Sequence, residues 1–373
     1  MEKILFVANI HKHFRAFHIP YIEYLKSEGY EVHVAANDPD TLVPEADKQF
    51  VLPINRNPFS INNLKAINKL KKIISDEKYS LIHCHTAMGS VVARMAAKEF
   101  RKSGVLKVLY TAHGFHFYKG SPKLFWLIYY PMEKYLAKYT DGLITINKED
   151  YQLAIENNFK AANIFKTSGV GININKFDDL SLEDSSQIRK KNGYGNDLFI
   201  IIYIAEFIDR KDHKFILEAI PLLKEKIDNF KFIFAGRGKL QIEMEQLAID
   251  LKVKESVDFL GFRKDIGELI LMSDIGISVS KQEGLPMNVA EEMFASKPVI
   301  ATNIRGHNDL IENAVSGFLF EKADQNEFVS KIIVLQKNPE IYNALSIGAK
   351  KAVKKFELSN CINEMATIYK KLL

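Results

Sequence analysis

Cysteine is scarce in this chain of 373 residues, which has only Cys84 and Cys361. Two cysteines cannot form the disulfide framework of a small secreted protein. Neither has partners at the spacing of a metal motif, so no metal is expected from them. Both are interpreted as ordinary buried thiols of a protein in a reducing compartment.

Long apolar runs are also missing. The first thirteen residues, MEKILFVANIHKH, contain a short apolar run that ends in basic residues, and they predict a first strand rather than a signal peptide. The most apolar helical stretch, FWLIYYPM, is far below membrane-spanning length. We therefore expect a cytoplasmic protein that meets a membrane only peripherally, at the inner face of the plasma membrane.

Neither sign of charge dominates the whole chain, whose net charge is +5, but residues 51–150 carry 16 Lys and Arg against 7 Asp and Glu. A basic stretch suits nucleic acid, an anionic membrane or solubility alone. Nucleic acid fits least well, because no known binding module is present. Two interpretations stay open. The Lys-rich helices expected in residues 51–150 contact a membrane, or they are amphipathic because they pack on a sheet.

Short β-branched runs alternate with helical patterns along the chain, and 373 residues favour two domains. Such alternation predicts doubly wound parallel sheets. Strands are expected at 3–10, 31–36, 81–86, 107–114 and 142–147, and, after a polar stretch at 175–197, at 198–206, 231–236, 257–261, 275–280, 298–302 and 317–320. We predict an α/β protein of two Rossmann-like domains, 1–180 and 181–355, facing across a cleft. A C-terminal helix at 356–373 is expected to close the second domain or to cross back to the first.

The stretch KQEGLPMNVAEE places Glu283 in a loop after a strand and Glu291 eight residues later on a helix. Ligands of open α/β sheets bind outside the carboxyl ends of the strands. The backbone amides of Gly284 and Leu285, with Pro286 at the start of the helix, predict an anion site between the two acids. An arrangement of acid, amides and acid suits a nucleotide sugar. Taken alone, the acids would be an ordinary helix face and loop charge.

Two cations, Arg210 and Lys211, follow the first strand of the second domain, where they can hold a diphosphate. Such a pair by itself more often serves solubility. The segment FAGRGK, with Gly238, follows the next strand but lacks the third glycine of a nicotinamide site. It is a weak binding motif, and a tight turn explains it equally well.

His113, in TAHGFHFYKG, follows a strand of the first domain, where it can bond a sugar hydroxyl or a phosphate. The alternative is a structural histidine, which is the interpretation given to His116. The histidines of HKHFRAFH (11–18) have no defensible metal geometry.

As a set, EGLPMNVAEEMFASKPVIAT, AEFIDRKDHKFILEAI and KFIFAGRGKL resemble the retaining glycosyltransferases of family 4, which have the GT-B fold. The first domain, with HTAMGSVVARMAAK and YTAHGFHFYKG, resembles the subset that builds bacterial capsule and exopolysaccharide repeat units. The chain departs from the pattern after strand one, where NIHKHFRAFH replaces a Gly-Gly pair, and at Ser296, where glycine is common.

The resemblance implies a role for each matching position. Glu283 contacts the donor sugar and Glu291 the ribose, while Arg210 and Lys211 neutralise the departing diphosphate. The other implied contacts are Gly284, Leu285 and Pro286 at the sugar and phosphates, His113 at the sugar from the acceptor domain, and Gly238, Phe262 and Arg263 at the base.

The implied activity is that of a retaining hexosyltransferase. It moves a sugar from a nucleotide sugar, with uridine expected from the resemblance alone, to an undecaprenyl-diphosphate-linked saccharide. No metal or other cofactor is expected, because the two cations take the place of a metal. A nucleotide-sugar epimerase of the same fold and a non-catalytic nucleotide- or membrane-binding protein are the alternatives.

Overall fold

The structure, a computed structural model, describes residues 1–177 and 185–373. The described chain divides into two compact units. Unit 1 comprises Met1–Gly171 and Ser359–Leu373, and unit 2 comprises Ile172–Leu358. The boundary expected between residues 180 and 181 lies outside the described residues. The last fifteen residues belong to the first unit.

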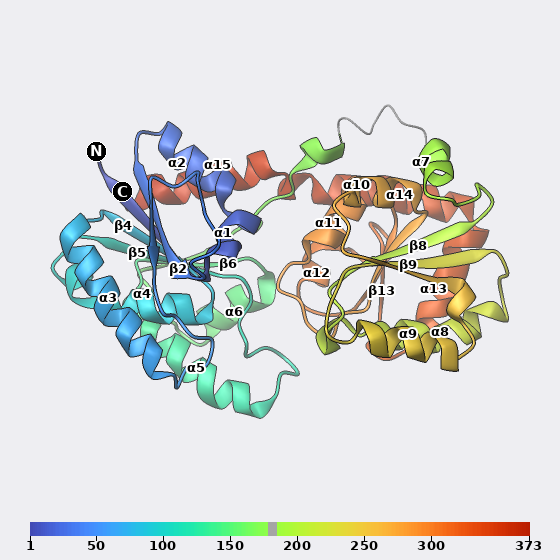
Figure 1. Ribbon diagram of the computed structural model, residues 1–373, viewed down its shortest axis with the longest axis horizontal. Coiled ribbons are helices and arrows are strands. Elements are labelled where there is room, and N and C mark those ends of the chain that lie inside the picture. The colour runs from blue at the N-terminus through green and yellow to red at the C-terminus, as the bar shows by residue number, and fades with distance from the viewer. Residues whose placement is uncertain (178–184) are drawn as a thin grey trace. The chain divides into compact units, whose positions relative to one another are not determined.

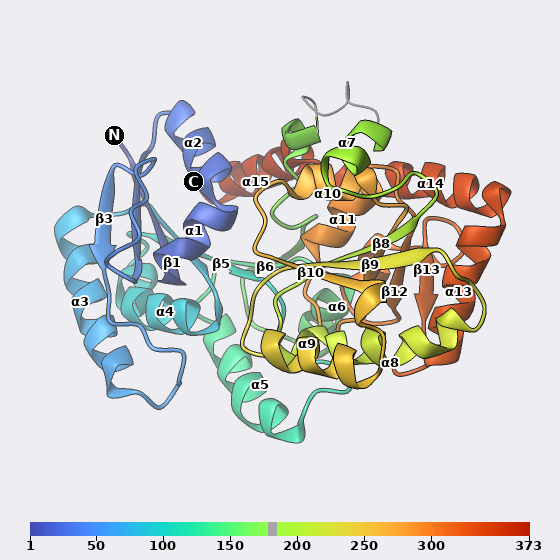
Figure 2. The same ribbon diagram turned by 45° about the vertical axis from the view of Figure 1, so that its right-hand side comes forward.

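The sheet of unit 1 is parallel throughout, with the strand order β3-β2-β1-β4-β5-β6-β7 (Figures 1 and 2). Its order reverses between β1 and β4, which is the switch point where doubly wound sheets bind ligands. The strands are β1 (Lys3–Ile10), β2 (Glu31–Asn37), β3 (Lys48–Val51), β4 (Leu81–His85), β5 (Lys107–Ala112), β6 (Gly142–Thr145) and β7 (Asn163–Lys166).

Helices cover both faces of this sheet. Figure 1 shows α3, α4 and α5 on one face and α1, α2 and the C-terminal α15 on the other. Side chains alternate accordingly along β4: Ile82 and Cys84 enter the core under α3 and α4, whereas His83 bonds Tyr369 of α15. The helices are α1 (His11–Phe17), α2 (Ile19–Ser27), α3 (Ile61–Glu77), α4 (Ala87–Lys102), α5 (Lys123–Ala137), α6 (Lys148–Glu156) and α15 (Leu358–Leu372).

Unit 2 repeats the architecture with the parallel order β10-β9-β8-β11-β12-β13, so its switch point lies between β8 and β11. Helices α8 and α9 lie on one face of this sheet and α10 and α11 on the other (Figure 2). The strands are β8 (Phe199–Ile204), β9 (Phe230–Ala235), β10 (Val257–Gly261), β11 (Ile275–Ser278), β12 (Val299–Thr302) and β13 (Phe318–Phe320). The helices are α7 (Ser185–Lys191), α8 (His213–Lys224), α9 (Gln241–Asp250), α10 (Ile266–Met272), α11 (Met287–Phe294), α12 (His307–Leu310), α13 (Gln325–Lys337) and α14 (Pro339–Val353), with 3-10 turns at Ile174–Phe177, Asp209–Lys211, Lys254–Ser256 and Lys354–Phe356.

The prediction of two Rossmann-like sheets is confirmed, because each unit is a doubly wound parallel sheet with helices on both faces. Two strands, β3 and β7, were not predicted. Both are four-residue edge strands whose side chains are exposed or half-buried, so they lack the apolar run that identifies a central strand. Among the described residues, no helix combines the length and apolarity needed to cross a bilayer.

Candidate active site

The switch point of unit 2 brings three predicted residues into contact. Arg210 and Lys211 lie in the short turn after β8, and Glu283 lies in the loop after β11. Lys211 Nζ contacts Glu283 Oε1 at 2.5 Å, and Arg210 Nη1 lies 3.3 Å from Glu283 Oε2. The turn and the loop are also joined through the backbone, since Lys281 N donates to Arg210 O at 2.8 Å. Residues 72 and 73 positions apart in sequence therefore form one charged cluster.

The cluster is partly sheltered from solvent. The Glu283 side chain is 8% exposed and that of Lys211 12%, whereas the Arg210 side chain is 42% exposed. Burial alone would raise the pKa of the Glu283 carboxyl. The charge of Lys211, followed by those of His307 and Arg210, outweighs burial and holds this pKa below its usual value. Two cations thus share one carboxylate, and the accessible guanidinium keeps a surplus positive charge at the strand ends.

A neighbouring loop, after β12, supports the cluster and was not predicted. Arg305 Nε donates to the Glu283 backbone oxygen at 3.1 Å. Gly306 has a φ of 85°, and a Cβ there would lie 2.8 Å from the Gly284 oxygen, so only glycine allows this approach. His307 is fully buried, and its Nε2 contacts Ser278 Oγ at 2.8 Å. In the sequence this loop is NIRGH, which follows β12, the strand beside β11.

Helix α11 begins where the loop ends. Pro286 is its N-cap residue, so the proline lies just before the first helical residue, and the helix ends at Phe294. Gly284 and Leu285 precede this cap, and the half-buried Glu291 lies in the second turn. Contacts of these residues with a sugar, a phosphate or a ribose stay predictions.

The remaining predicted residues follow β9 and β10, at the same carboxyl edge of the sheet. A Cβ at Gly238 would lie 2.4 Å from the Phe207 oxygen, so close packing against the loop after β8 explains this glycine. Phe262 is 61% exposed, and Arg263 Nε donates to Asp265 Oδ1 at 2.7 Å. No base is needed to account for these positions, and their contact with one stays a prediction.

In unit 1, the switch point is built around Thr86, which lies between β4 and α4 with a φ of 62°. Its hydroxyl oxygen accepts from Asn9 N at 3.0 Å, and Gly89 N donates to Asn9 Oδ1 at 2.6 Å. A Cβ at Gly89 would lie 2.9 Å from the Ala8 backbone, so glycine is required where α4 approaches β1. A left-handed non-glycine residue held by such bonds is typical of functional sites.

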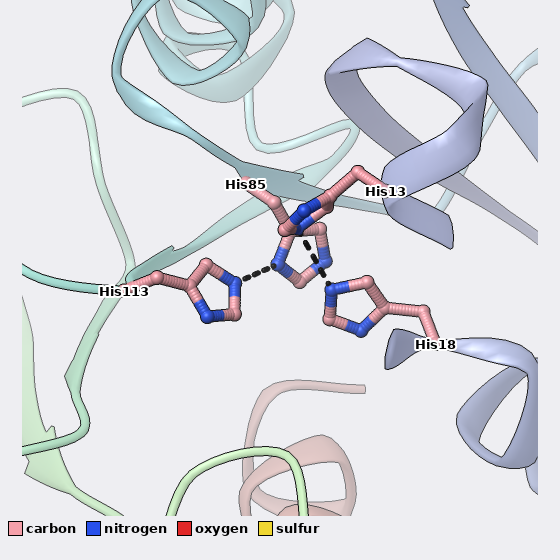
Figure 3. A group of neighbouring side chains, drawn as sticks. All are labelled: His13, His18, His85 and His113. Atoms are coloured by element: carbon pink, nitrogen blue, oxygen red, sulfur yellow. Dashed lines mark hydrogen bonds between the residues drawn. The ribbon is translucent and has the colours of Figure 1, made fainter. Parts of the chain in front are cut away.

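His113 joins a group of four histidines at this switch point (Figure 3). His13 and His18 follow β1, His85 ends β4, and His113 follows β5. The Nε2 atoms of His13 and His18 lie 3.2 Å apart, and His113 Nε2 lies 3.3 Å from His85 Nδ1. Burial lowers the pKa of His13 to about 4 and those of the other three well below the usual value, so the four imidazoles are neutral at pH 7.

Of these four histidines, only His113 was predicted from the sequence as a site residue. No metal-binding geometry was predicted for residues 11–18. The other histidines of these segments lie elsewhere. His11 contacts the Asp38 and Phe50 backbone oxygens, His83 bonds Tyr369 and Thr111, and the His116 ring stacks on Tyr129. A usable signal was the pattern HCH at the end of a strand, which places His83 and His85 on one face.

Beside the histidine group lies a pocket of about 620 Å³. Its walls include His13 and His113 together with Lys12, Arg56 and Glu133. The pocket therefore combines apolar surface with cations at the carboxyl edge of the sheet, where a charged ligand of unit 1 is expected to bind.

Two family models match the chain, one in each half. Residues 3–147 match the model for glycosyl transferase 4-like proteins, and residues 184–352 match that for glycosyl transferases group 1. The chain is 44% identical over 368 residues to a putative glycosyltransferase, EpsD, of Bacillus subtilis, with 99% of this chain and 96% of the relative covered. It is 26% identical over 355 residues to the UDP-Gal:alpha-D-GlcNAc-diphosphoundecaprenol alpha-1,3-galactosyltransferase of Escherichia coli, with 93% and 90% covered.

Among solved structures, the chain is similar to Anabaena HepE in complex with UDP and glucose, with a TM-score of 0.79, 19% identity and all of both chains covered. At this identity the likeness shows the fold alone. The chain therefore belongs to the family of group 1, family 4-like glycosyltransferases, and it is a GT-B glycosyltransferase of the bacterial exopolysaccharide and capsule type.

Proposed function

We propose that this glycosyltransferase moves a sugar from a UDP-sugar, with retention of configuration, to a lipid-diphosphate-linked saccharide during assembly of a polysaccharide repeat unit. The single observation that carries the proposal is the Arg210, Lys211 and Glu283 cluster at the switch point of unit 2. Unit 2 is proposed to bind the donor and unit 1 the acceptor. The names of the Escherichia coli relative and of the HepE complex support the choice of acceptor and of nucleotide.

In the proposed reaction, the bond between the anomeric carbon and the diphosphate breaks, and a bond from this carbon to an acceptor oxygen forms on the same face. The acceptor hydroxyl proton passes to the leaving phosphate. Negative charge grows on the diphosphate as its bond breaks. Lys211 and the partly exposed Arg210 are positioned to stabilise that charge, which is the contribution a metal makes in other transferases.

Glu283 has two proposed tasks. Its carboxylate fixes the Lys211 ammonium at 2.5 Å, and an oxygen of the same carboxylate accepts a hydroxyl of the donor sugar. Glu291 is proposed to hold the ribose, Gly284, Leu285 and Pro286 the phosphates and sugar, and Gly238, Phe262 and Arg263 the base. His113 is the residue of unit 1 proposed to touch the donor sugar.

A membrane surface is proposed on α3, α4 and α5 of unit 1. These helices and the residues just before α3 form an apolar groove of about 600 Å³ lined by Phe59, Leu64, Val91, Met95, Met132 and Tyr135. Phe59 is 80% exposed and Leu127 73% exposed, in a stretch where 16 basic residues face 7 acidic ones. Apolar side chains among lysines suit the headgroup region of an anionic bilayer, and this position brings unit 1 to a lipid-linked acceptor at the inner face of the membrane.

Vesicle flotation tests the membrane proposal. The chain is expected to float with vesicles of anionic phosphatidylglycerol and not with phosphatidylcholine alone. Leu127→Asp should reduce flotation, whereas Ile242→Asp, at a position of unit 2 that is 82% exposed, should not. Equal flotation of both variants would contradict the proposed surface.

Donor specificity tests the transfer proposal. Release of nucleoside diphosphate would be measured from UDP-, GDP- and ADP-sugars, in EDTA, with and without a bacterial extract of lipid-linked sugars. Release from a UDP-sugar only when lipid is present is the expected result. Interconversion of the sugar without acceptor would favour an epimerase, and no release with any donor would favour a binding protein; neither alternative is favoured by the relatives, which are transferases.

A further inference from the structure

We propose that His13, His18, His85 and His113 form a binding site for one Zn²⁺ ion in unit 1. Each residue offers one ring nitrogen, and the four nitrogens lie within 4.8 Å of one another. The site lies in unit 1, whereas the Arg210, Lys211 and Glu283 cluster lies in unit 2. His113 belongs to both proposals, but binding of the ion is measured without the transfer reaction.

The distances match the coordination geometry of zinc. A Zn–N bond is roughly 2.0–2.1 Å long, so two nitrogens of a tetrahedral site are about 3.3 Å apart. The His13 and His18 Nε2 atoms are 3.2 Å apart, and the His113 Nε2 and His85 Nδ1 atoms are 3.3 Å apart. The His13–His18 pair therefore already has the length of one tetrahedron edge, and the other ligand nitrogens, all within 4.8 Å of one another, reach this length by shifts of up to roughly 1.5 Å.

Hydrogen bonds between neutral imidazoles explain each of these two pairs, but they leave one nitrogen unexplained. His85 is fully buried, and its Nε2 has no hydrogen-bond partner. Figure 3 shows this nitrogen directed toward His13 and His18, whose ring centroids lie 5.8 and 3.9 Å from that of His85. A buried acceptor without a donor is costly, and a cation bound to His85 through Nε2, in place of the Nδ1 contact with His113, would satisfy its lone pair.

The ligand set selects the kind of ion. The group consists of imidazoles, with no carboxylate, which suits Zn²⁺, Cu²⁺, Ni²⁺ or Co²⁺ and not Mg²⁺ or Ca²⁺. An imidazole binds a metal ion through the lone pair of its neutral ring. Four neutral ligands favour the tetrahedral geometry of zinc.

Such an ion would tie together segments that are distant in sequence. His13 belongs to α1, His18 joins α1 to α2, and His85 and His113 follow adjacent strands of the sheet. We therefore expect the ion to stabilise unit 1 against unfolding. Trp126 in α5, the single tryptophan of the chain, packs on the core of unit 1 and reports this unfolding by its fluorescence.

The test uses the full chain without a histidine tag, stripped with EDTA and returned to metal-free buffer. Titration with Co²⁺ is expected to give the intense visible absorption of a tetrahedral site, saturating at one equivalent and lost when Zn²⁺ is added. Zn²⁺ at about 100 times its Kd should raise the Tm of the tryptophan transition by about 5–11 °C.

Two variants locate the ion. His13 and His113 are only partly buried, so His13→Gln and His113→Gln should fold, and each should weaken Zn²⁺ binding by at least about 10-fold. His116→Gln, three positions from His113 but outside the group, is the matched control and should bind as the wild type does.

No tetrahedral Co²⁺ spectrum, or equal binding by all the variants, would overturn the proposal. X-ray absorption at the zinc edge of the wild-type protein tests the ligands without any variant: four imidazoles are expected, and fewer than three would overturn the site.

Discussion

The buried ion pair between Arg94 of α4 and Glu133 of α5 allows a stability prediction of defined size. Their side chains are 1% and 5% exposed, and Arg94 Nη2 lies 2.7 Å from Glu133 Oε2. Tyr110 OH donates to the other Glu133 oxygen at 3.1 Å, and the Arg94 guanidinium lies 4.3 Å from the Tyr110 ring centre. Glu133 also lines the pocket beside the histidine group, so this pair supports one wall of the pocket.

The variant Glu133→Gln keeps the shape of the side chain but removes its charge. Removing one partner of a buried pair costs roughly 3–5 kcal/mol, because the other charge stays buried without compensation. A glutamine oxygen can still accept from Arg94, so we expect a loss near 3 kcal/mol. For a unit of this size, such a loss lowers the Tm by about 6–12 °C.

Thermal and urea unfolding followed by Trp126 fluorescence measure this loss, since Trp126 lies on the same helix as Glu133. The double variant Arg94→Met with Glu133→Leu should lose less than Glu133→Gln, because it leaves no buried charge. Glu99→Gln, in a pair whose side chains are 39% and 66% exposed, is the control and should change stability by less than about 0.5 kcal/mol. A Glu133→Gln variant within 1 kcal/mol of the wild type would refute this reasoning.

Three further predictions concern unit 2 and are measured by urea unfolding with far-UV circular dichroism. Ser296 has a φ of 59°, so Ser296→Gly should stabilise by about 0.5–1 kcal/mol; a loss would contradict the strain argument. Gly238→Ala should destabilise by about 2 kcal/mol or more, because a Cβ would lie 2.4 Å from the Phe207 oxygen, and an unchanged midpoint would be the contrary result. Burial lowers the pKa of His307 to about 4. Below pH 6.5 the unfolded chain therefore binds a proton at His307 that the folded chain does not bind. Stability should therefore fall as pH drops from 6.5 toward 4, and His307→Gln should reduce the loss between pH 7 and 5 by about 2 kcal/mol; equal losses would disprove the link.

The sheets of both units were predictable because their central strands are buried on both faces and appear as continuous apolar runs. The sequence IIIYI in β8 has no alternation to obscure this pattern. The edge strand β3 escaped prediction, since KQFV is half-exposed and carries no such run. Its pairing with β2 provides the stabilisation that its own residues do not indicate.

The charged cluster was predictable for a similar reason. Arg210, Lys211 and Glu283 follow strands that are neighbours in a doubly wound sheet, so the topology alone places them at one edge. Arg305 and His307 were missed, because their contacts depend on the close approach of Gly306, which a sequence pattern does not reveal.

The histidine group could not be predicted from local sequence patterns. Its members come from four positions between residues 13 and 113, and no local spacing joins them. Only the register of β4 beside β1 and β5 brings His85 to the residues that follow those two strands.

The most direct test of the account is the rate of sugar transfer to the lipid-linked acceptor in EDTA, for the wild type and for Lys211→Met. Lys214→Met is the matched control, because its side chain is 60% exposed and lies outside the cluster. The wild type and Lys214→Met should transfer sugar without a divalent cation, and Lys211→Met should be slower by about 100-fold or more. A wild-type enzyme that needs a divalent cation, or a folded Lys211→Met variant with unchanged turnover, would contradict this prediction.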